Sequence, residues 1–137
     1  MQSWVFKGIA AALLSLFMAF GALAQQAEIE GTIGSQFEAF KADDFETAFT
    51  FATPRLQQLF QSPQNFQRMV QGGYPMVWRP AEVRYLNLRE ENGAFMQTVE
   101  IIDGDGVRHL LDYRMEQTEA GWRIGGVQIL EAPDVSA

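Results

Sequence analysis

The sequence has 137 residues, with no cysteine and only one histidine. Without cysteine, the chain can form neither a disulfide framework nor a thiolate metal site, so its fold must depend on packing. A single histidine leaves no spacing from which to build a transition-metal site. The stretch Asp103–Gly106 does not fit a calcium-binding loop, because Arg114 stands where its last ligand, glutamate, is expected. We therefore predict no metal, no cofactor and no catalytic residue.

Basic residues are also scarce, with ten Lys and Arg against seventeen Asp and Glu and a formal net charge of −7. An acidic surface repels the phosphates of nucleic acids and of anionic lipid headgroups. We expect no nucleic-acid partner, and no membrane partner for the mature protein. The same charge also favours solubility, which is sufficient to account for it.

The sequence has one long apolar run, and it lies at the N-terminus. Lys7 precedes the run at residues 9–23, which ends in the small-residue pattern Ala22-Leu23-Ala24 before Gln25. This order is typical of a secretory signal peptide. A membrane anchor is the alternative, but it needs about 20 apolar residues, more than this run provides. We predict cleavage near Ala24 and a periplasmic or secreted protein.

The remaining chain has the length of one domain. We divide the sequence into a signal peptide at 1–24, a single domain at 25–130 and a flexible tail at 131–137. Apolar residues of the first part of the domain recur at helical spacing, at Ile29, Ile33, Phe37 and Phe40. Three helix starts follow, each with a capping residue: Asp43 with Glu46, Thr53 before Pro54, and Ser62 before Pro63.

The segment between Gly72-Gly73 and Pro80 is the least regular of the domain. Its two prolines oppose a central strand, so we expect a connecting loop outside regular structure. Tyr74 and Trp78 are large aromatic residues in this loop. Because loops often carry binding residues, Tyr74 and Trp78 are candidates for a ligand site; the alternative, that they fill the core, carries equal weight.

The second half of the domain alternates apolar and polar residues, as half-buried strands do. We predict four antiparallel strands, over residues 83–88, 95–102, 107–116 and 122–129. In the third, one face would hold Val107, His109, Leu111, Tyr113 and Met115. The alternation breaks at Gly125-Gly126, which we interpret as a β-bulge that bends the last strand. The bulge would turn one set of apolar residues to the core: Trp122, Ile124, Val127 and Ile129.

Helices followed by a four-stranded antiparallel meander predict an α+β fold, in which the curved sheet packs one face on the helices. This order, with the sequence Gly121 to Val127 (GWRIGGV) on the last strand, resembles the nuclear-transport-factor-two-like fold, also called SnoaL-like or cystatin-like. Residues 62–80 and 110–132 resemble an uncharacterised family of small exported bacterial proteins, classed as a domain of unknown function. The resemblance implies a cone-shaped domain in an exported setting, with no assigned catalytic residues.

Two classes of function remain open. The first is a non-catalytic module in which Tyr74, Trp78, His109 and Tyr113 contact a small apolar ligand or a protein partner, with a homodimer also open. The second is a pocket enzyme of isomerase or dehydratase type that uses His109 and Tyr113. A strand places Asp112 on the face opposite His109 and Tyr113, so these three side chains cannot converge without a bulge. We therefore favour the non-catalytic module.

Overall fold

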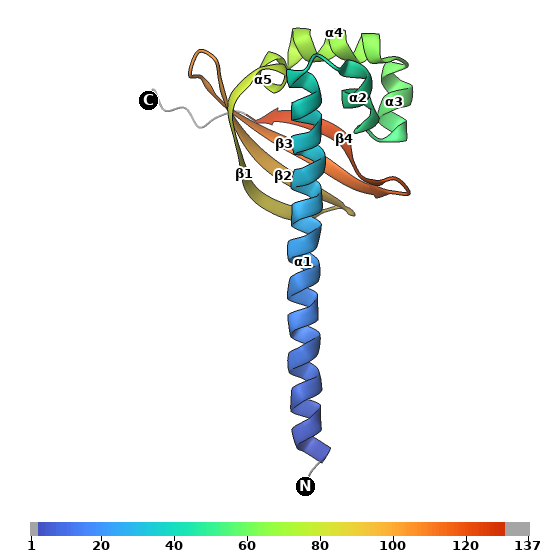
Figure 1. Ribbon diagram of the computed structural model, residues 1–137, viewed down its shortest axis with the longest axis vertical. Coiled ribbons are helices and arrows are strands. Elements are labelled where there is room, and N and C mark those ends of the chain that lie inside the picture. Colours follow the sequence, from blue (N-terminus) through green and yellow to red (C-terminus); the bar gives the residue numbers. More distant parts are fainter. Residues whose placement is uncertain (1–2, 131–137) are drawn as a thin grey trace.

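The computed structural model describes residues 3–130, and the side chains of residues 20–130. Five helices precede four strands (Figure 1), which confirms the predicted α+β class. Their bounds are α1 Ser3–Lys41, α2 Phe45–Thr50, α3 Pro54–Phe60, α4 Pro63–Gly73, α5 Pro75–Trp78, β1 Pro80–Glu91, β2 Ala94–Asp103, β3 Arg108–Thr118 and β4 Gly121–Leu130. The tail predicted at 131–137 lies outside the described residues.

The short helices begin at side-chain caps. The Thr53 hydroxyl accepts a hydrogen bond from the Leu56 amide at 3.3 Å, and Ser62 does the same for Asn65 at 3.1 Å. Both caps were predicted, and a proline follows each at the first helical position, where no amide is needed. The cap of α2 is Asp44 and not Asp43 as we predicted.

The structure corrects two predictions at this end of the domain, the cap of α2 and the loop after Gly73. Asp43 has a φ of +55°, so it closes the turn after α1 and cannot cap α2. The segment after Gly73 is not an irregular loop, because Pro75 starts the one-turn helix α5. A proline that opposes a strand is still compatible with the first turn of a helix.

The four strands form an antiparallel meander in the order β1-β2-β3-β4, with β1 and β4 as its edges. The predicted bulge is present in β4. Arg114 faces Gly126 and Met115 faces Ile124, which leaves Gly125 as the extra residue. Trp122 and Ile124 before the bulge and Val127 after it therefore lie on the same face. Figure 1 shows the sheet curving behind α1.

The core lies between α1 and the concave face of the sheet. Ile29, Ile33, Phe37 and Phe40 of α1 are buried, as predicted, against sheet residues that include Leu111, Tyr113, Met115, Trp122 and Ile124. Two residues that we predicted on the buried face are instead exposed, Val107 by 51% and Ile129 by 44%. Val107 belongs to the β2–β3 turn, and Ile129 is the last residue but one of β4.

The opposite face of the sheet is covered by ion pairs. Arg89 binds Asp112 at 2.7 Å, and Asp112 also accepts a hydrogen bond from Thr98 at 2.6 Å. Glu100 is paired with Arg108 at 2.6 Å. The long arginine side chains lie over the acids and shield them from water, so Asp112 and Glu100 are buried without a covering helix.

The N-terminal helix extends well beyond the body of the domain (Figure 1). The residues from Phe20 to Ala24 are all exposed, and the first buried residue among those described is Ile29. Within the described part of the chain, no helix combines the length and the apolar character needed to cross a membrane.

Candidate functional site

An apolar pocket of about 270 Å³ lies between the helices and β4. Its walls come mainly from α1, α3, α4, α5 and β4, and α1 and β4 are far apart in the sequence. The lining residues are Gln36, Phe40, Ala52, Leu56, Phe60, Phe66, Met69, Val70, Tyr74, Val77, Ile124, Gly126 and Val127. None of these side chains is charged, so the pocket offers a favourable environment to an uncharged, apolar group.

Local sequence features aim these side chains at one space. Leu56 and Phe60 are four residues apart on α3, and Phe66 and Val70 are four apart on α4, so each pair shares one helix face. The bulge of β4 also orients a side chain of the pocket. Without the extra residue Gly125, strand alternation would turn Val127 to the opposite face of the sheet, and the pocket would lose that wall.

Two polar side chains line the pocket, and both are hydrogen-bonded to the backbone. The buried Gln36 amide donates from Nε2 to the Ala48 carbonyl at 3.1 Å. The Tyr74 hydroxyl donates to the Val127 carbonyl at 3.1 Å. These bonds fix the two side chains. The pocket therefore presents no free acid or base, and its geometry suits binding more than proton transfer.

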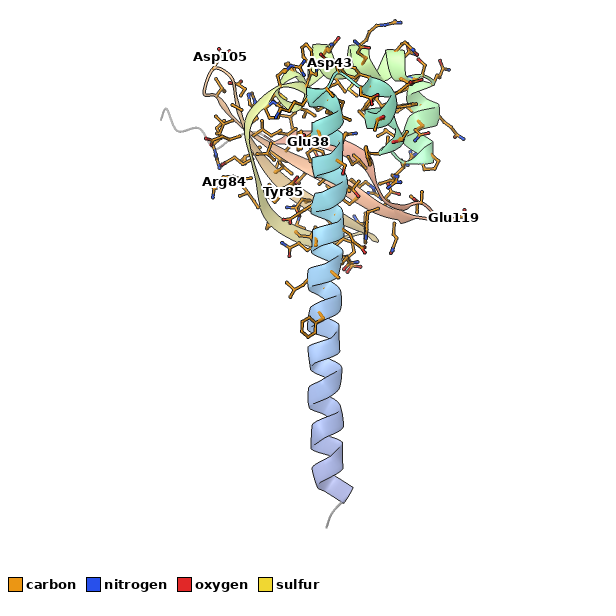
Figure 2. The ribbon with its side chains drawn as sticks, in the orientation of Figure 1. Glu38, Asp43, Arg84, Tyr85, Asp105 and Glu119 are labelled. Atoms are coloured by element: carbon orange, nitrogen blue, oxygen red, sulfur yellow. The ribbon has the colours of Figure 1, made fainter. Side chains whose placement is uncertain are left out.

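Of the four predicted site residues, the structure places only Tyr74 in this pocket. Trp78 lies on α5, where its indole Nε1 donates to Asp43 Oδ1 at 2.9 Å. The Arg79 guanidinium stacks 4.3 Å above the Trp78 ring and binds the same Asp43 oxygen at 2.7 Å. The hydrogen bonds from Trp78 and Arg79 lower the pKa of Asp43. Figure 2 shows Asp43 at the end of α1, so this cluster fastens α5 to the α1–α2 turn.

His109 lies near the start of β3, beside the β2–β3 turn. Its Nε2 is 2.8 Å from Asp103 Oδ2, and Asp103 Oδ1 accepts hydrogen bonds from the Asp105 and Val107 amides. The hydrogen bond from His109 is the largest of the effects that lower the pKa of Asp103. Asp105 marks the tip of this hairpin in Figure 2. The bonds of Asp103 hold the β2–β3 turn, and His109 does not line the pocket.

Tyr113 is fully buried beside the pocket, opposite Val127 in the sheet. Its ring packs edge-on to Phe37 at 6.2 Å, and burial raises the pKa of its hydroxyl above the usual range. Among residues 20–130 this hydroxyl has no hydrogen-bond partner. His109 and Tyr113 share a face, as predicted, but four residues of strand separate them by about 13 Å. The structure does not bring them together as an acid–base pair.

Most of the pocket residues were not predicted as a site. The sequence shows Leu56, Phe60, Phe66, Met69 and Val70 as the apolar faces of short helices, which is the pattern of ordinary core residues. What distinguishes them is the space left between α3, α4 and β4. A space of this kind depends on the packing of several elements, and no single stretch of sequence encodes it.

Comparison with known proteins identifies the family. The DUF4864 family, described as a domain of unknown function, matches residues 22–137. The chain belongs to the DUF4864 family. No curated protein and no solved structure matches it. The match of the DUF4864 domain begins next to the predicted cleavage site and includes every residue of the pocket.

The role of Trp78 in this DUF4864 domain can be tested by mutation. The Trp78→Ala variant loses the half-buried ring and its stacking with Arg79, so we expect the free energy of unfolding to fall by about 1–2 kcal/mol. In the control Trp78→Phe, a ring remains beneath Arg79, and roughly half of the loss should be recovered. Urea unfolding measures both. Unchanged stability of Trp78→Ala would show that Trp78 does not fasten α5.

Proposed function

We propose that the mature protein is an exported, non-catalytic binding module of the nuclear-transport-factor-two-like fold. Its site is the pocket between α1, α3, α4 and β4, and its ligand is an apolar group. The observation that carries the proposal is the uncharged lining of a cavity of about 270 Å³ that the side chains leave open. Typical ligand pockets hold about 300–1,000 Å³, so this pocket suits a small molecule or a single large side chain.

The position of the N-terminal segment supports the export of this module. Cleavage after Ala24 takes no buried side chain from residues 20–24, since all five are exposed. The helix that supplies Gln36 and Phe40 to the pocket begins to pack at Ile29, beyond the proposed cleavage site. The core and the pocket are therefore independent of these five residues, as a cleaved signal peptide requires.

The isomerase or dehydratase alternative receives less support from the geometry. It requires His109 and Tyr113 at one site, and neither lines the pocket. His109 is bound to Asp103 at the β2–β3 turn, and the Tyr113 hydroxyl is enclosed in the core. A general acid or base must come within hydrogen-bonding distance of its substrate, and neither group offers this from its place in the fold.

The pocket is tested by filling it. Leu56 lines the pocket on α3, and Val107 is 51% exposed in the β2–β3 turn and outside the lining. We expect Leu56→Trp to lower the affinity for the uncharged fluorescent dye Nile red by about tenfold or more, which is a loss of about 1.4 kcal/mol. The matched control Val107→Trp should bind the dye as the wild type does. Equal binding by all three proteins would show that the dye does not use this pocket.

A further inference from the structure

The two edges of the sheet differ in their protection against pairing with another strand. Strand β1 begins at Pro80, contains five charged residues and has two register shifts against β2. Proline, charge and bulges are the features by which natural sheets block an edge. Strand β4 has one bulge, at Gly125, and one charged residue, Arg123, with none from Ile124 to Leu130. The edge of β4 is therefore the less protected of the two.

The chain already pairs a segment of its own with the first half of this edge. Ala52 and Ile124 form a parallel bridge. The Ile124 amide donates to the Phe51 carbonyl at 2.8 Å, and the Ile124 carbonyl accepts from the Thr53 amide at 2.9 Å. An extended backbone thus fits against β4, and these bonds show that the backbone groups of Ile124 point away from β3.

The backbone groups of two residues beyond the bulge point in the same direction. The register across Gly125 places Val127 and Ile129, like Ile124, at positions whose amides and carbonyls face away from β3. The bond from Tyr74 to the Val127 carbonyl agrees with this assignment. From the described residues outside the sheet, no hydrogen bond reaches the amides of Val127 and Ile129 or the carbonyl of Ile129.

An apolar groove runs beside these backbone groups. The pocket includes Gly126 and Val127 in its wall, and it shares Leu56 with a second depression at the bulge, lined by Arg55, Leu56, Gln58, Leu59 and Gly125. Leu59 and Ile129 contribute exposed apolar surface along the same side. A free strand edge beside an apolar pocket is the arrangement that binds extended peptides.

We propose that an extended segment of a partner protein pairs with β4 at Val127 and Ile129 and inserts one apolar side chain into the pocket. This rests on the proposed function of the pocket as an apolar site, and it names the occupant. The pairing would extend the sheet by one strand, with backbone hydrogen bonds to both free amides. The side chain in the pocket would supply the apolar contact, and the backbone hydrogen bonds would fix the orientation of the segment along β4.

The chemistry of the site restricts the segment. The pocket has no charged residue, so the anchor is an uncharged side chain such as Leu, Ile, Met or Phe. Among the described residues, Arg55 is the one charged residue that lines the pocket or the depression beside it. Residues that flank the anchor are therefore neutral or acidic, because a basic residue beside Arg55 would be repelled.

The proposal is tested by selecting peptides that bind the protein and then by removing the backbone amide of Ile129. Random linear octapeptides displayed on phage are selected on residues 25–137, and a selected peptide is labelled for fluorescence anisotropy. Ile129→Pro removes an amide that faces away from β3, so the ladder to β3 keeps its bonds. The matched control Ile129→Ala keeps the amide and loses the side chain. We expect Ile129→Pro to weaken peptide binding about tenfold relative to Ile129→Ala, while both bind Nile red as the wild type does.

Amide exchange of the wild type provides a measurement that needs no variant. The amides of Val127 and Ile129 should exchange rapidly in the free protein and become protected when the selected peptide binds. The proposal is overturned if no peptide is enriched, if Ile129→Pro and Ile129→Ala bind peptide equally, or if these two amides stay unprotected. It is also overturned if sedimentation shows a dimer that Ile129→Pro dissociates, since a second copy would then occupy the edge. The Nile red measurement on Leu56→Trp tests the pocket without any peptide. A failure of the pocket proposal can therefore be told from a failure of the peptide proposal.

Discussion

The Trp122→Ala variant is expected to lose about 3–5 kcal/mol of the free energy of unfolding, the largest effect that we predict for a single substitution. Trp122 is 5% exposed and packs edge-on against Phe95 with 5.5 Å between ring centroids. Its removal costs the transfer energy of a large aromatic side chain and leaves a cavity. For a domain of this size the melting temperature should fall by roughly 15 °C or more.

Thermal unfolding with Leu59→Ala as control measures the effect of Trp122→Ala. Leu59 is exposed, so its removal should change stability by less than about 0.5 kcal/mol. If both variants melted alike, Trp122 would contribute no more than a surface residue. The assignment of the concave face as the core would then be wrong.

The Asp112→Asn variant is expected to lose about 2 kcal/mol at neutral pH, because a buried carboxylate that accepts charged hydrogen bonds is replaced by a neutral amide. Asp112 is buried on the outer face, where Arg89 donates at 2.7 Å and Thr98 at 2.6 Å. The Arg89 hydrogen bond is the largest cause of the lowered pKa of Asp112. In the variant, a neutral amide with one acceptor oxygen replaces the two carboxylate oxygens that Arg89 and Thr98 bind.

The lowered pKa of Asp112 gives this contribution a defined pH dependence. A group with a lower pKa in the folded state stabilises the protein above its unfolded pKa, which is about 3.9 for aspartate. The contribution is lost as the pH falls through the folded pKa. The difference in stability between wild type and Asp112→Asn should therefore be full at neutral pH and shrink in acid.

Urea unfolding over a range of pH checks this dependence. The control Glu119→Gln makes the same change in net charge at the exposed β3–β4 turn, where Figure 2 shows Glu119. It should change stability little at any pH. A constant difference between Asp112→Asn and wild type from neutral pH to strong acid would contradict the role of the Asp112 carboxylate.

The parts of the fold that depend on neighbouring residues could be predicted from the sequence. The stripe of α1, the caps Thr53 and Ser62, and the bulge at Gly125 each follow from spacing or from backbone chemistry within a few residues. Asp43 and Asp44 show the limit of such predictions. Both can cap a helix; in the structure Asp43 has a positive φ and binds Trp78 and Arg79, and Asp44 caps α2.

The candidate site could not be predicted in the same way. Tyr74 was a candidate because an aromatic residue in a proline-bounded segment is unusual, and in the structure it lines the pocket. His109 and Trp78 were also candidates because of the chemistry of their side chains, yet their ring nitrogens bind Asp103 and Asp43. The parallel bridge between Ala52 and Ile124 joins segments that are distant in sequence, and no local pattern announces it.

The central claim is that an exported module holds an apolar group between α3, α4 and β4, and native mass spectrometry of the protein recovered from the periplasm tests it most directly. We predict a chain that begins at Gln25 and carries a bound mass, which the same preparation of Leu56→Trp lacks. Wild type and Leu56→Trp that both carry no added mass, or the same added mass, would contradict the pocket as the site. A chain that still contained Met1 to Ala24 would contradict the proposed export by signal-peptide cleavage.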